Sequence, residues 1–449
     1  MRLSYAILGL FYFSGLALAE NRVSIAVVDS GLDIEHEAFD GRVWINQDEV
    51  EANRRDDDAN GYKDDVNGWN FANNNNQLID YKFDFSFTPE VARFFELQSK
   101  SIKRTATMKE LNELRFLASN KEVRKNLQIF GNYAHGTHVS GIAVGDNQEL
   151  EVQGIKLIPT TVPSNKEKTV ENTEYIDGIR DSIVKAGIRQ LVSAQATMMG
   201  SIGSYIGAAN IDIANLSFGM NVQAASMALK PILDKLPGGK VSSSELLKYA
   251  TYMVSEATKA QEVLFTAAPD TLFAVAAGND ARDNSEYPIT PANVKADNKI
   301  SVAATYKGRL APFSNYSATL VDIAAPGTDV MSASPKGRYI NMSGTSQAAP
   351  LVARAAGLIK AENPELGPMS IKSILMGTVD KNDYLAGKVV SGGVLNLERA
   401  VYAGGLTAQG YSIEEAIDTA LTGVPTVELV AEFLFEMPEF FVEPLPSGF

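Results

Sequence analysis

Three histidines, His36, His135 and His138, occur in the 449-residue chain, so any reaction that uses an imidazole base must use one of them. Histidine can take and return a proton near neutral pH. Residues 135–141 read His-Gly-Thr-His-Val-Ser-Gly, and their small side chains favour the start of a helix. We therefore expect a base at His135 to project from a first helical turn. A packed or metal-binding pair at spacing i, i+3 is the alternative, although the His-Glu-x-x-His pattern of zinc helices is absent.

Asp29 directly follows the apolar run Val23–Val28, which predicts a carboxylate at the end of a buried strand. A buried carboxylate is costly unless another group pairs with it. The N–H of an imidazole is a suitable partner, because the carboxylate would fix its tautomer and stabilise its protonated form. An aspartate that only closes a turn is the alternative.

Ser346 and Asn279 are the candidates for a nucleophile and an oxyanion donor. Ser346 precedes a small, apolar segment, Leu351–Ile359, that suits a buried helix. A serine at a helix N-terminus lies near unpaired N–H groups and the positive end of the helix dipole, which favour a developing oxyanion. Asn279 follows the apolar run Phe273–Ala277, and its amide can donate a hydrogen bond to such an oxyanion. An ordinary N-cap serine and a Gly-Asn turn are the alternatives.

The order Asp29, His135, Asn279, Ser346 and the residues around each resemble the subtilisin family of serine proteases from Val23 to about Tyr402. Asp, then His, then Ser is the chain order of subtilisin itself. The segments that carry the resemblance are Asp29–Gly31, His135–Val139, Ala277–Asn279 and Gly344–Ser346, supported by Asn215–Gly219, Ala325–Gly327 and Gly392–Asn396.

The resemblance implies a role for each residue. Ser346 would attack the scissile carbonyl, His135 would act as base and then acid, and Asp29 would orient His135. Asn279 and the backbone N–H of Ser346 would hold the oxyanion. The segment formed by Ser217, Phe218 and Gly219 would pair with an extended polypeptide substrate by backbone hydrogen bonds. No cofactor would take part in the chemistry.

The remaining pattern predicts the scaffold that would position these residues. Apolar runs alternate with segments of helical periodicity, which indicates an α/β fold. The runs are Val23–Val28, Ile211–Leu216, Leu272–Ala276 and Ile300–Ala304, and the helical segments include Tyr175–Leu191 and Ser243–Ala260. We expect a three-layer, subtilisin-like α/β fold with a mostly parallel central sheet flanked by helices. Ligand sites in such sheets gather at the carboxyl ends of the strands.

Several features depart from the family pattern. Asp29 and His135 lie 106 positions apart, and a charged, helix-favouring insertion at about residues 88–130 occupies part of this interval. We expect it to decorate the surface, since scaffolds tolerate such insertions, with a role in shaping substrate access as the alternative. The chain has no segment of propeptide length before Asp29, and Gln347 replaces the methionine usual after the nucleophile. The second wall of the substrate groove is expected in Leu157–Lys168. These departures keep a non-catalytic binding protein as an alternative, and an esterase as a weaker one.

An acidic stretch at residues 56–67 resembles an EF-hand loop and predicts a calcium site. Gly61 occupies the sharp-turn position, but Asn67 stands where a bidentate glutamate would close the site, so a weaker or differently shaped site is implied. A solvated acidic turn is the alternative. The predicted ligands are Asp56, Asp58, Asn60, Asp64 and the carbonyl of Tyr62.

The composition and the two ends of the chain limit which partners and which location we expect for the protein. Residues 1–19 have the pattern of a signal peptide cleaved before Glu20, with a membrane anchor as the alternative. We therefore expect an exported protein, secreted or periplasmic, that is a monomer without stable membrane insertion. The net charge of −14 argues against nucleic acid as a partner, and the absence of cysteine excludes disulfides. A catalytic domain at 20–402 would precede an acidic, Phe-containing extension at 403–449. We expect this extension to pack on the domain, with an inhibitory or partner-binding element as the alternative.

Overall fold

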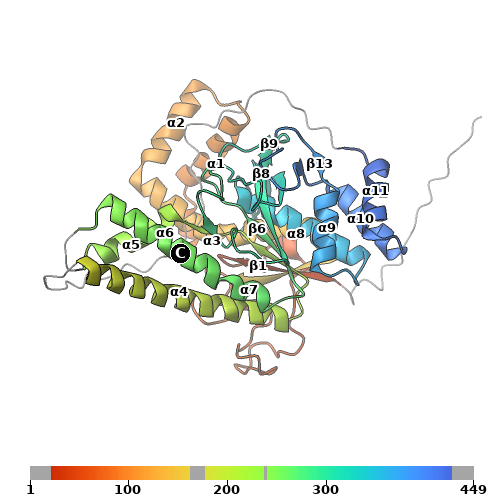
Figure 1. The fold of residues 1–449 in the computed structure, drawn as a ribbon, viewed down its shortest axis with the longest axis horizontal. Coiled ribbons are helices and arrows are strands. Elements are labelled where there is room, and N and C mark those ends of the chain that lie inside the picture. The colour runs from red at the N-terminus through yellow and green to blue at the C-terminus, as the bar shows by residue number, and fades with distance from the viewer. Residues whose placement is uncertain (1–21, 162–176, 237–239, 427–449) are drawn as a thin grey trace, which may run out of the picture.

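A mostly parallel sheet forms the centre of the computed structural model, which describes residues 22–161, 177–236 and 240–426 (Figure 1). In this part of the chain the sheet has ten strands in the order β13-β14-β10-β8-β6-β4-β1-β3-β2, with β9 paired to β8. The pairs β13–β14 and β8–β9 are antiparallel, and the others are parallel. The strands of this sheet are β1 Val23–Asp29, β2 Gly68–Asn70, β3 Leu150–Lys156, β4 Ile213–Leu216, β6 Leu272–Ala276, β8 Lys299–Tyr306, β9 Arg309–Leu310, β10 Ile323–Pro326, β13 Asp380–Lys381 and β14 Gly393–Val394.

The four predicted apolar runs form the adjacent central strands β8, β6, β4 and β1. Every residue of β1, β4 and β6 is buried, because helices cover both faces of the sheet. Because side chains on both faces of each strand are buried, these strands are continuous apolar runs in the sequence rather than alternations of apolar and polar residues. The α/β fold with a mostly parallel central sheet is therefore confirmed.

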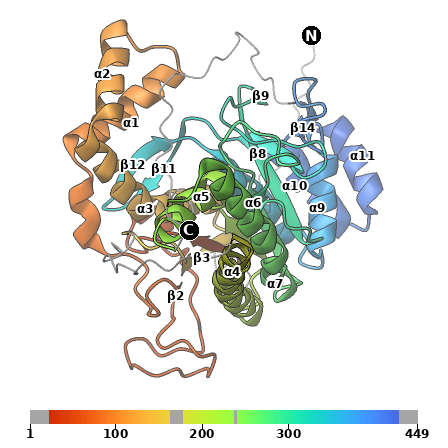
Figure 2. The same cartoon turned by 60° about the vertical axis from the view of Figure 1, so that its left-hand side comes forward.

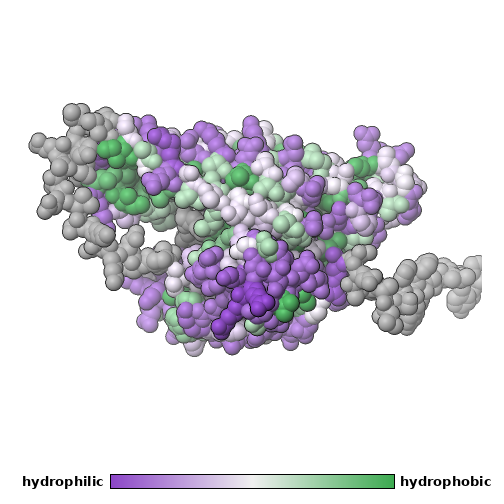
Figure 3. All heavy atoms as spheres, turned by 90° about the horizontal axis from the view of Figure 1, so that it is seen from below, coloured by the Kyte–Doolittle hydropathy of each residue, from purple (hydrophilic) through white to green (hydrophobic). Residues whose placement is uncertain are grey.

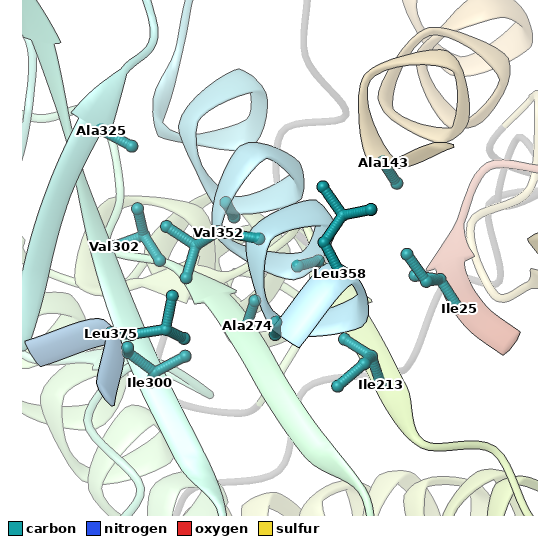
Figure 4. Close-up of a cluster of buried hydrophobic side chains, with 14 of the residues drawn as sticks. Ile25, Ala143, Ile213, Ala274, Ile300, Val302, Ala325, Val352, Leu358 and Leu375 are labelled. Carbon is teal, nitrogen blue, oxygen red and sulfur yellow. The ribbon is translucent and has the colours of Figure 1, made fainter. Parts of the chain in front are cut away.

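Helices α3 and α8 cover one face of the sheet, with α9, α10 and α11 beyond them (Figures 1 and 2). Figure 4 shows Val352 and Leu358 of α8 facing Ile25, Ile213 and Val302 of three strands. The bounds are α3 Lys121–Val144, α8 Thr345–Glu362, α9 Pro368–Gly377, α10 Leu397–Ala408 and α11 Ile413–Gly423. This core fixes the N-terminus of α8 above the carboxyl ends of the strands.

Helices α4 and α7 cover the opposite face, and α5 and α6 pack beside the first half of α4 in a cluster of their own. Helix α6 has the predicted bounds, whereas α4 continues well past the predicted end at Leu191. The bounds are α4 Asp177–Ala208, α5 Val222–Leu233, α6 Ser243–Ala260 and α7 Glu262–Thr266. Two small antiparallel sheets complete the fold, one of β5 Met220–Asn221 with β7 Ile289–Thr290, the other of β11 Val330–Ser334 with β12 Arg338–Met342.

The predicted insertion forms α1 Pro89–Ile102, α2 Met108–Ser119 and the first turns of α3. Helix α1 packs against β12 and α2, and the cluster that joins them includes Phe94, Phe130 and Met342 (Figure 2). The expectation that a helix begins at His135 is wrong. Asn120 caps α3 by accepting hydrogen bonds from the next turn, and no proline interrupts the helix, so His135 lies in the middle of α3. The insertion is thus continuous with the helix that carries the predicted base.

The predicted boundary at 402/403 falls inside α10, and α11 packs on α9 and α10. A Cβ placed on Gly377 of α9 would lie 2.6 Å from the side chain of Ile417 in α11, which shows how closely these helices pack. The described part of the predicted extension, up to residue 426, therefore packs through α11 on α9 and α10. The predicted signal peptide and residues 427–449 lie outside the described residues. No helix within the described part is both long enough and apolar enough to cross a bilayer.

Candidate active site

A buried aspartate–histidine pair lies at the carboxyl edge of the sheet. Asp29 is the last residue of β1, and its Oδ1 lies 2.8 Å from Nδ1 of His135 on α3. Both side chains are completely buried. The backbone N–H of Ser30 also donates to Oδ1 of Asp29 at 2.6 Å, which fixes the carboxylate. This geometry leaves Nε2 as the ring nitrogen of His135 that faces away from the carboxylate.

Close backbone contact between α3 and the turn after β1 makes this pairing feasible. A Cβ on Gly136 would lie 2.0 Å from the carbonyl oxygen of Gly31, so only glycine fits at this position of the helix. The N–H of Gly136 donates to the hydroxyl of Ser30 at 3.0 Å. The glycine after His135 therefore sets the distance between the helix and the strand end.

Ser346 lies in the first turn of α8, next to the ends of β4 and β6. Its hydroxyl donates to the carbonyl oxygen of Ser217 at 3.2 Å, and the hydroxyl of Ser217 donates to the carbonyl oxygen of Ser346 at 2.9 Å. Strand β4 pairs with β1 up to the Leu216–Val28 position, so Ser217 lies beside Asp29 at the sheet edge. The predicted nucleophile and the predicted base thus lie on either side of the same strand ends.

Asn279 follows β6 and is held against the start of α8. Its Oδ1 accepts hydrogen bonds from the backbone N–H of Thr345 at 2.8 Å and from the Thr345 hydroxyl at 3.0 Å. The same hydroxyl accepts a hydrogen bond from the N–H of Gly278 at 3.0 Å. These bonds fix the Oδ1 end of the Asn279 amide against the first turn of α8, next to Ser346.

The Ser346 hydroxyl and the His135 ring are not hydrogen-bonded to each other. Nε2 of His135 makes no hydrogen bond with any described residue, and Ser346, 3% exposed, donates to Ser217 instead. Hydrogen bonds of this kind are often unmade before substrate binds. Rotation of the serine side chain about its Cα–Cβ bond is the movement that would redirect the hydroxyl.

The predicted substrate-pairing segment, Ser217, Phe218 and Gly219, lies between β4 and β5 and outside both strands. A Cβ on Gly219 would meet Ile289 of β7 at 2.9 Å, so this segment runs close to β7. Its backbone lies directly over the N-terminus of α8, as the two bonds between Ser217 and Ser346 show.

Lys156, which the sequence reasoning missed, lies beside Asp29. It ends β3 and is the register partner of Asp29, and it is 4% exposed. Its Nζ donates to the carbonyl oxygen of Ser30 at 2.5 Å and to the Thr160 hydroxyl at 3.2 Å. Burial lowers the pKa of Lys156 to about 8, although the charges of Asp29 and Asp80 act in the opposite direction. The sequence does contain a signal for Lys156, because this charged residue directly follows the uncharged run Val152–Ile155.

The other two histidines serve packing. Nε2 of His138 lies 3.1 Å from the carbonyl oxygen of Ile340, and burial lowers the pKa of His138 to about 3. His36 caps a short 3₁₀ helix through Nδ1, which accepts a hydrogen bond from the N–H of Ala38. These two imidazoles make hydrogen bonds to backbone groups, namely the Ile340 carbonyl for His138 and the Ala38 N–H and Arg338 carbonyl for His36.

The acidic loop at 45–67 projects from the lower side of the molecule in Figure 1 and makes the centre of the surface in Figure 3 strongly hydrophilic. Carboxylate oxygens of Glu49, Asp58 and Asp65 lie within 4.8 Å of one another, and we call these residues the acidic cluster. Asp58 alone among the predicted ligands belongs to it.

The other predicted ligands have different contacts. The carboxylate of Asp56 accepts from the N–H groups of Asn60 and Gly61, and that of Asp64 accepts from the N–H of Arg54. Oδ1 of Asn60 accepts from the N–H of Tyr62, whose ring packs on Trp69, Phe71 and Tyr205. The sequence reasoning missed Glu49 because it lies before the twelve-residue window of an EF-hand loop.

The acidic cluster fits a calcium ion in its chemistry. Burial raises the pKa of both Glu49 and Asp65, and the negative charge of Asp58 raises both further. No lysine or arginine of the described residues forms an ion pair with these three carboxylates. Oxygen donors that repel one another in a partly buried loop are the kind that calcium binds and neutralises.

Comparison with known proteins connects this site to one family. Residues 96–403 match the model described as the subtilase family. The match includes His135, Asn279 and Ser346. Asp29 lies before the matched residues and joins the site through its hydrogen bond to His135.

Individual relatives match over shorter stretches. The cell wall-associated protease of Bacillus subtilis (strain 168) is 42% identical over 112 residues, 25% of this chain and 12% of that protein. Subtilisin BL of Lederbergia lenta is 38% identical over 123 residues, 27% of this chain and 44% of that protein. The alignments thus span less than half of these relatives.

Solved structures align over most of the chain at low similarity. A cold-adapted subtilisin-like serine proteinase covers 84% of this chain and 87% of its own, with 19% identity and a TM-score of 0.42. A structure on the assembly of subtilase cytotoxin SubAB covers 90% and 93%, with 18% identity and a TM-score of 0.45. Because the family model matches well over half of the residues, the chain belongs to the subtilase family.

Proposed function

We propose that this protein is an exported serine endopeptidase that hydrolyses peptide bonds through an acyl-enzyme on Ser346. The observation that carries the proposal is the buried Asp29–His135 pair, 2.8 Å apart, at the sheet edge where α8 presents Ser346 beside Asn279. A buried carboxylate bonded to one imidazole nitrogen leaves the other nitrogen as a base.

The proposed reaction proceeds in two halves. The Ser346 oxygen attacks the scissile carbonyl carbon while Nε2 of His135 takes the hydroxyl proton. The Asn279 amide and the Ser346 N–H stabilise the oxyanion. His135 then gives its proton to the leaving amine as the C–N bond breaks. Water, deprotonated by His135, attacks the acyl-enzyme and releases the acid, and the proton returns to Ser346.

Substrate binding would displace the Ser346 hydroxyl from its hydrogen bond to Ser217 and so allow the side chain to rotate. In the structure the Ser217 carbonyl accepts a hydrogen bond from Ser346. A peptide that pairs with Ser217–Gly219 by backbone hydrogen bonds would offer an N–H to the same carbonyl. This N–H would replace the serine hydroxyl, which is then available to His135. The hydrogen bond that Ser346 loses is worth about 1 kcal/mol. The new hydrogen bond from the peptide N–H to the Ser217 carbonyl compensates for this loss.

The remaining parts of the proposal concern location and stability. We propose that residues 1–19 direct export and are removed, and that the protein acts outside the cytoplasm on polypeptides. Residues 20–402 would form the catalytic domain and 403–449 its extension. The acidic cluster would bind a structural calcium ion, with Glu49, Asp58 and Asp65 as ligands.

The test is covalent labelling by a fluorophosphonate probe, which reacts with an activated serine. We expect labelling of the folded protein and none of Ser346→Ala or His135→Ala, together with cleavage of an unstructured polypeptide by the unmutated protein alone. A folded protein that neither takes the label nor cleaves the polypeptide, with and without calcium, would refute the proposal. Equal rates on matched peptides and esters would agree with an acyl-enzyme mechanism. Hydrolysis of esters without any cleavage of peptides would contradict the proposal.

A further inference from the structure

A basic groove lies at the start of α3. Its volume is about 560 Å³. Lys121, Arg124 and Lys125 line one side, and Thr160 and Thr161, which follow β3, line the other. The three basic side chains are exposed. The threonines belong to the segment in which the second wall of the substrate groove was expected.

The groove is continuous with the helix face that carries the proposed base. Residues 121, 125, 128, 132 and 135 recur at intervals of three or four, so they lie along one face of α3. Asn132 lines the groove one turn before His135, and its Nδ2 lies 3.4 Å from the carbonyl oxygens of Pro159 and Thr160. These contacts hold α3 against the segment that follows β3. The groove therefore lies along the same face of α3 that carries the buried His135 further on.

Asn132 provides a buried acceptor at the inner end of the groove. It is 3% exposed, and its Oδ1 accepts no hydrogen bond from any described residue. A buried carbonyl oxygen without a donor is costly. A backbone N–H of a bound peptide is the kind of donor that would satisfy it.

The positions of the cations are unfavourable for the helix itself. Lys121, Arg124 and Lys125 lie in its first two turns, where the helix dipole favours anions and disfavours cations. No acidic side chain of the described residues forms an ion pair with any of the three. The chain as a whole carries a charge of −14, so this cluster is a local exception to its acidic character. An anionic ligand would compensate for both the dipole and the mutual repulsion of the cations.

We propose that this groove binds acidic side chains of the polypeptide substrate and so sets the preference of the enzyme. The inference rests on the proposed peptidase function. At 1.5 Å per residue, the cations lie about 15 to 21 Å along α3 from His135. An extended peptide covers this distance in roughly four to six residues. The preferred substrates therefore carry Asp or Glu about four to six residues from the scissile bond.

The test is a set of peptides that share one cleaved sequence and differ only at the fourth to sixth residues from the scissile bond. One series changes these residues on the amino side of the bond, and a second series changes them on the carboxyl side. Three glutamates, three glutamines or three lysines occupy these positions. We expect kcat/KM for the glutamate peptide to exceed that for the glutamine peptide by about tenfold, since each exposed ion pair contributes about a factor of two. The triple variant Lys121→Gln, Arg124→Gln, Lys125→Gln should remove this difference, and so should 0.5 M salt, which screens exposed charges.

Charge reversal and a matched control make the test specific. The double variant Arg124→Glu, Lys125→Glu should prefer the lysine peptide. A control with the same charge change, Lys109→Gln, Lys235→Gln, Lys295→Gln, replaces exposed lysines elsewhere and should keep the glutamate preference. Thermal unfolding and fluorophosphonate labelling of each variant show whether it folds and retains the reactive serine.

Two results would overturn the inference. One is equal cleavage of the glutamate and glutamine peptides by the unmutated protein at low salt. The other is loss of the preference in the control variant as well as in the triple variant. Failure to cleave any peptide of either series would instead refute the proposed peptidase function.

Discussion

Replacing Lys156 by methionine should change how the stability of the protein depends on pH. Lys156 is the buried cation beside Asp29, and its pKa is about 8 in the folded protein against 10.5 for an exposed lysine. Between these two values the unfolded chain binds a proton that the folded protein does not bind. The free energy of unfolding of the wild type therefore rises with pH across this window, and below pH 8 the fold bears the full cost of burying the charge.

The size of the effect follows from the two pKa values. Each tenfold difference in proton affinity corresponds to 1.36 kcal/mol, so burial of the charged lysine costs about 3 kcal/mol at neutral pH. Most of this cost is relieved by pH 9.5, which gives a rise of about 2 kcal/mol between pH 7 and pH 9.5. Methionine has a similar length and no charge, so the variant lacks this rise. It also leaves the Ser30 carbonyl and the Thr160 hydroxyl without their donor, which costs about 1 kcal/mol each at any pH.

The assay is urea unfolding followed by the fluorescence of the two tryptophans, Trp44 and Trp69, both of which are buried. Both proteins carry Ser346→Ala, so that neither digests itself during the experiment. We expect the difference in unfolding free energy between them to change by about 2 kcal/mol from pH 7 to pH 9.5, in favour of the lysine protein at high pH. Parallel pH profiles for the two proteins would refute the reasoning.

Three further perturbations test the geometry of the site and the loop. Gly136→Ala would place a methyl group 2.0 Å from the Gly31 carbonyl, so we expect a lower melting temperature and a loss of about 100-fold in kcat/KM. Thr345→Val removes the hydroxyl that holds Oδ1 of Asn279, and kcat should fall about tenfold with little change in KM, while Thr345→Ser should restore it. Calcium at about 100 times its Kd should stabilise the Ser346→Ala protein by about 2.7 kcal/mol, and chelation should lower the melting temperature again. An unchanged melting temperature on chelation would contradict a calcium site in the acidic cluster.

Local patterns were sufficient to predict the central elements of the fold. Strand β6 and helix α6 have the predicted bounds. The strand is a short apolar run between polar turns, and the helix begins at a capping box in which Ser242 and Glu245 satisfy each other's backbone N–H groups. Each signal lies within a few residues of the element that it defines. Neighbouring structure therefore has little influence on where these elements begin and end.

Features that depend on distant residues were not predictable in this way. The glycines around His135 indicated a helix start, yet they serve close packing against distant segments. Gly136 packs against Gly31, more than a hundred residues earlier, and Gly141 packs against Ser332 and Ala333. Glu49 and Lys156 owe their importance to neighbours brought close by the fold, namely Asp65 and Asp29. A single sequence contains no record of such contacts, so the residue types alone could not identify them.

The length of α3 connects the insertion before His135 to the proposed groove and to the proposed base. One uninterrupted helix carries the cations of the groove at its first turns and the imidazole of His135 further along. An α-helix transmits axial position rigidly over such a length, because each turn is fixed to the next by backbone hydrogen bonds. Close contact between Gly136 and Gly31 leaves the helix no room to shift toward β1. A residue bound in the groove as proposed would thus be held at a constant distance from His135, and this constancy would turn a charged surface into a preference at a defined position of the substrate.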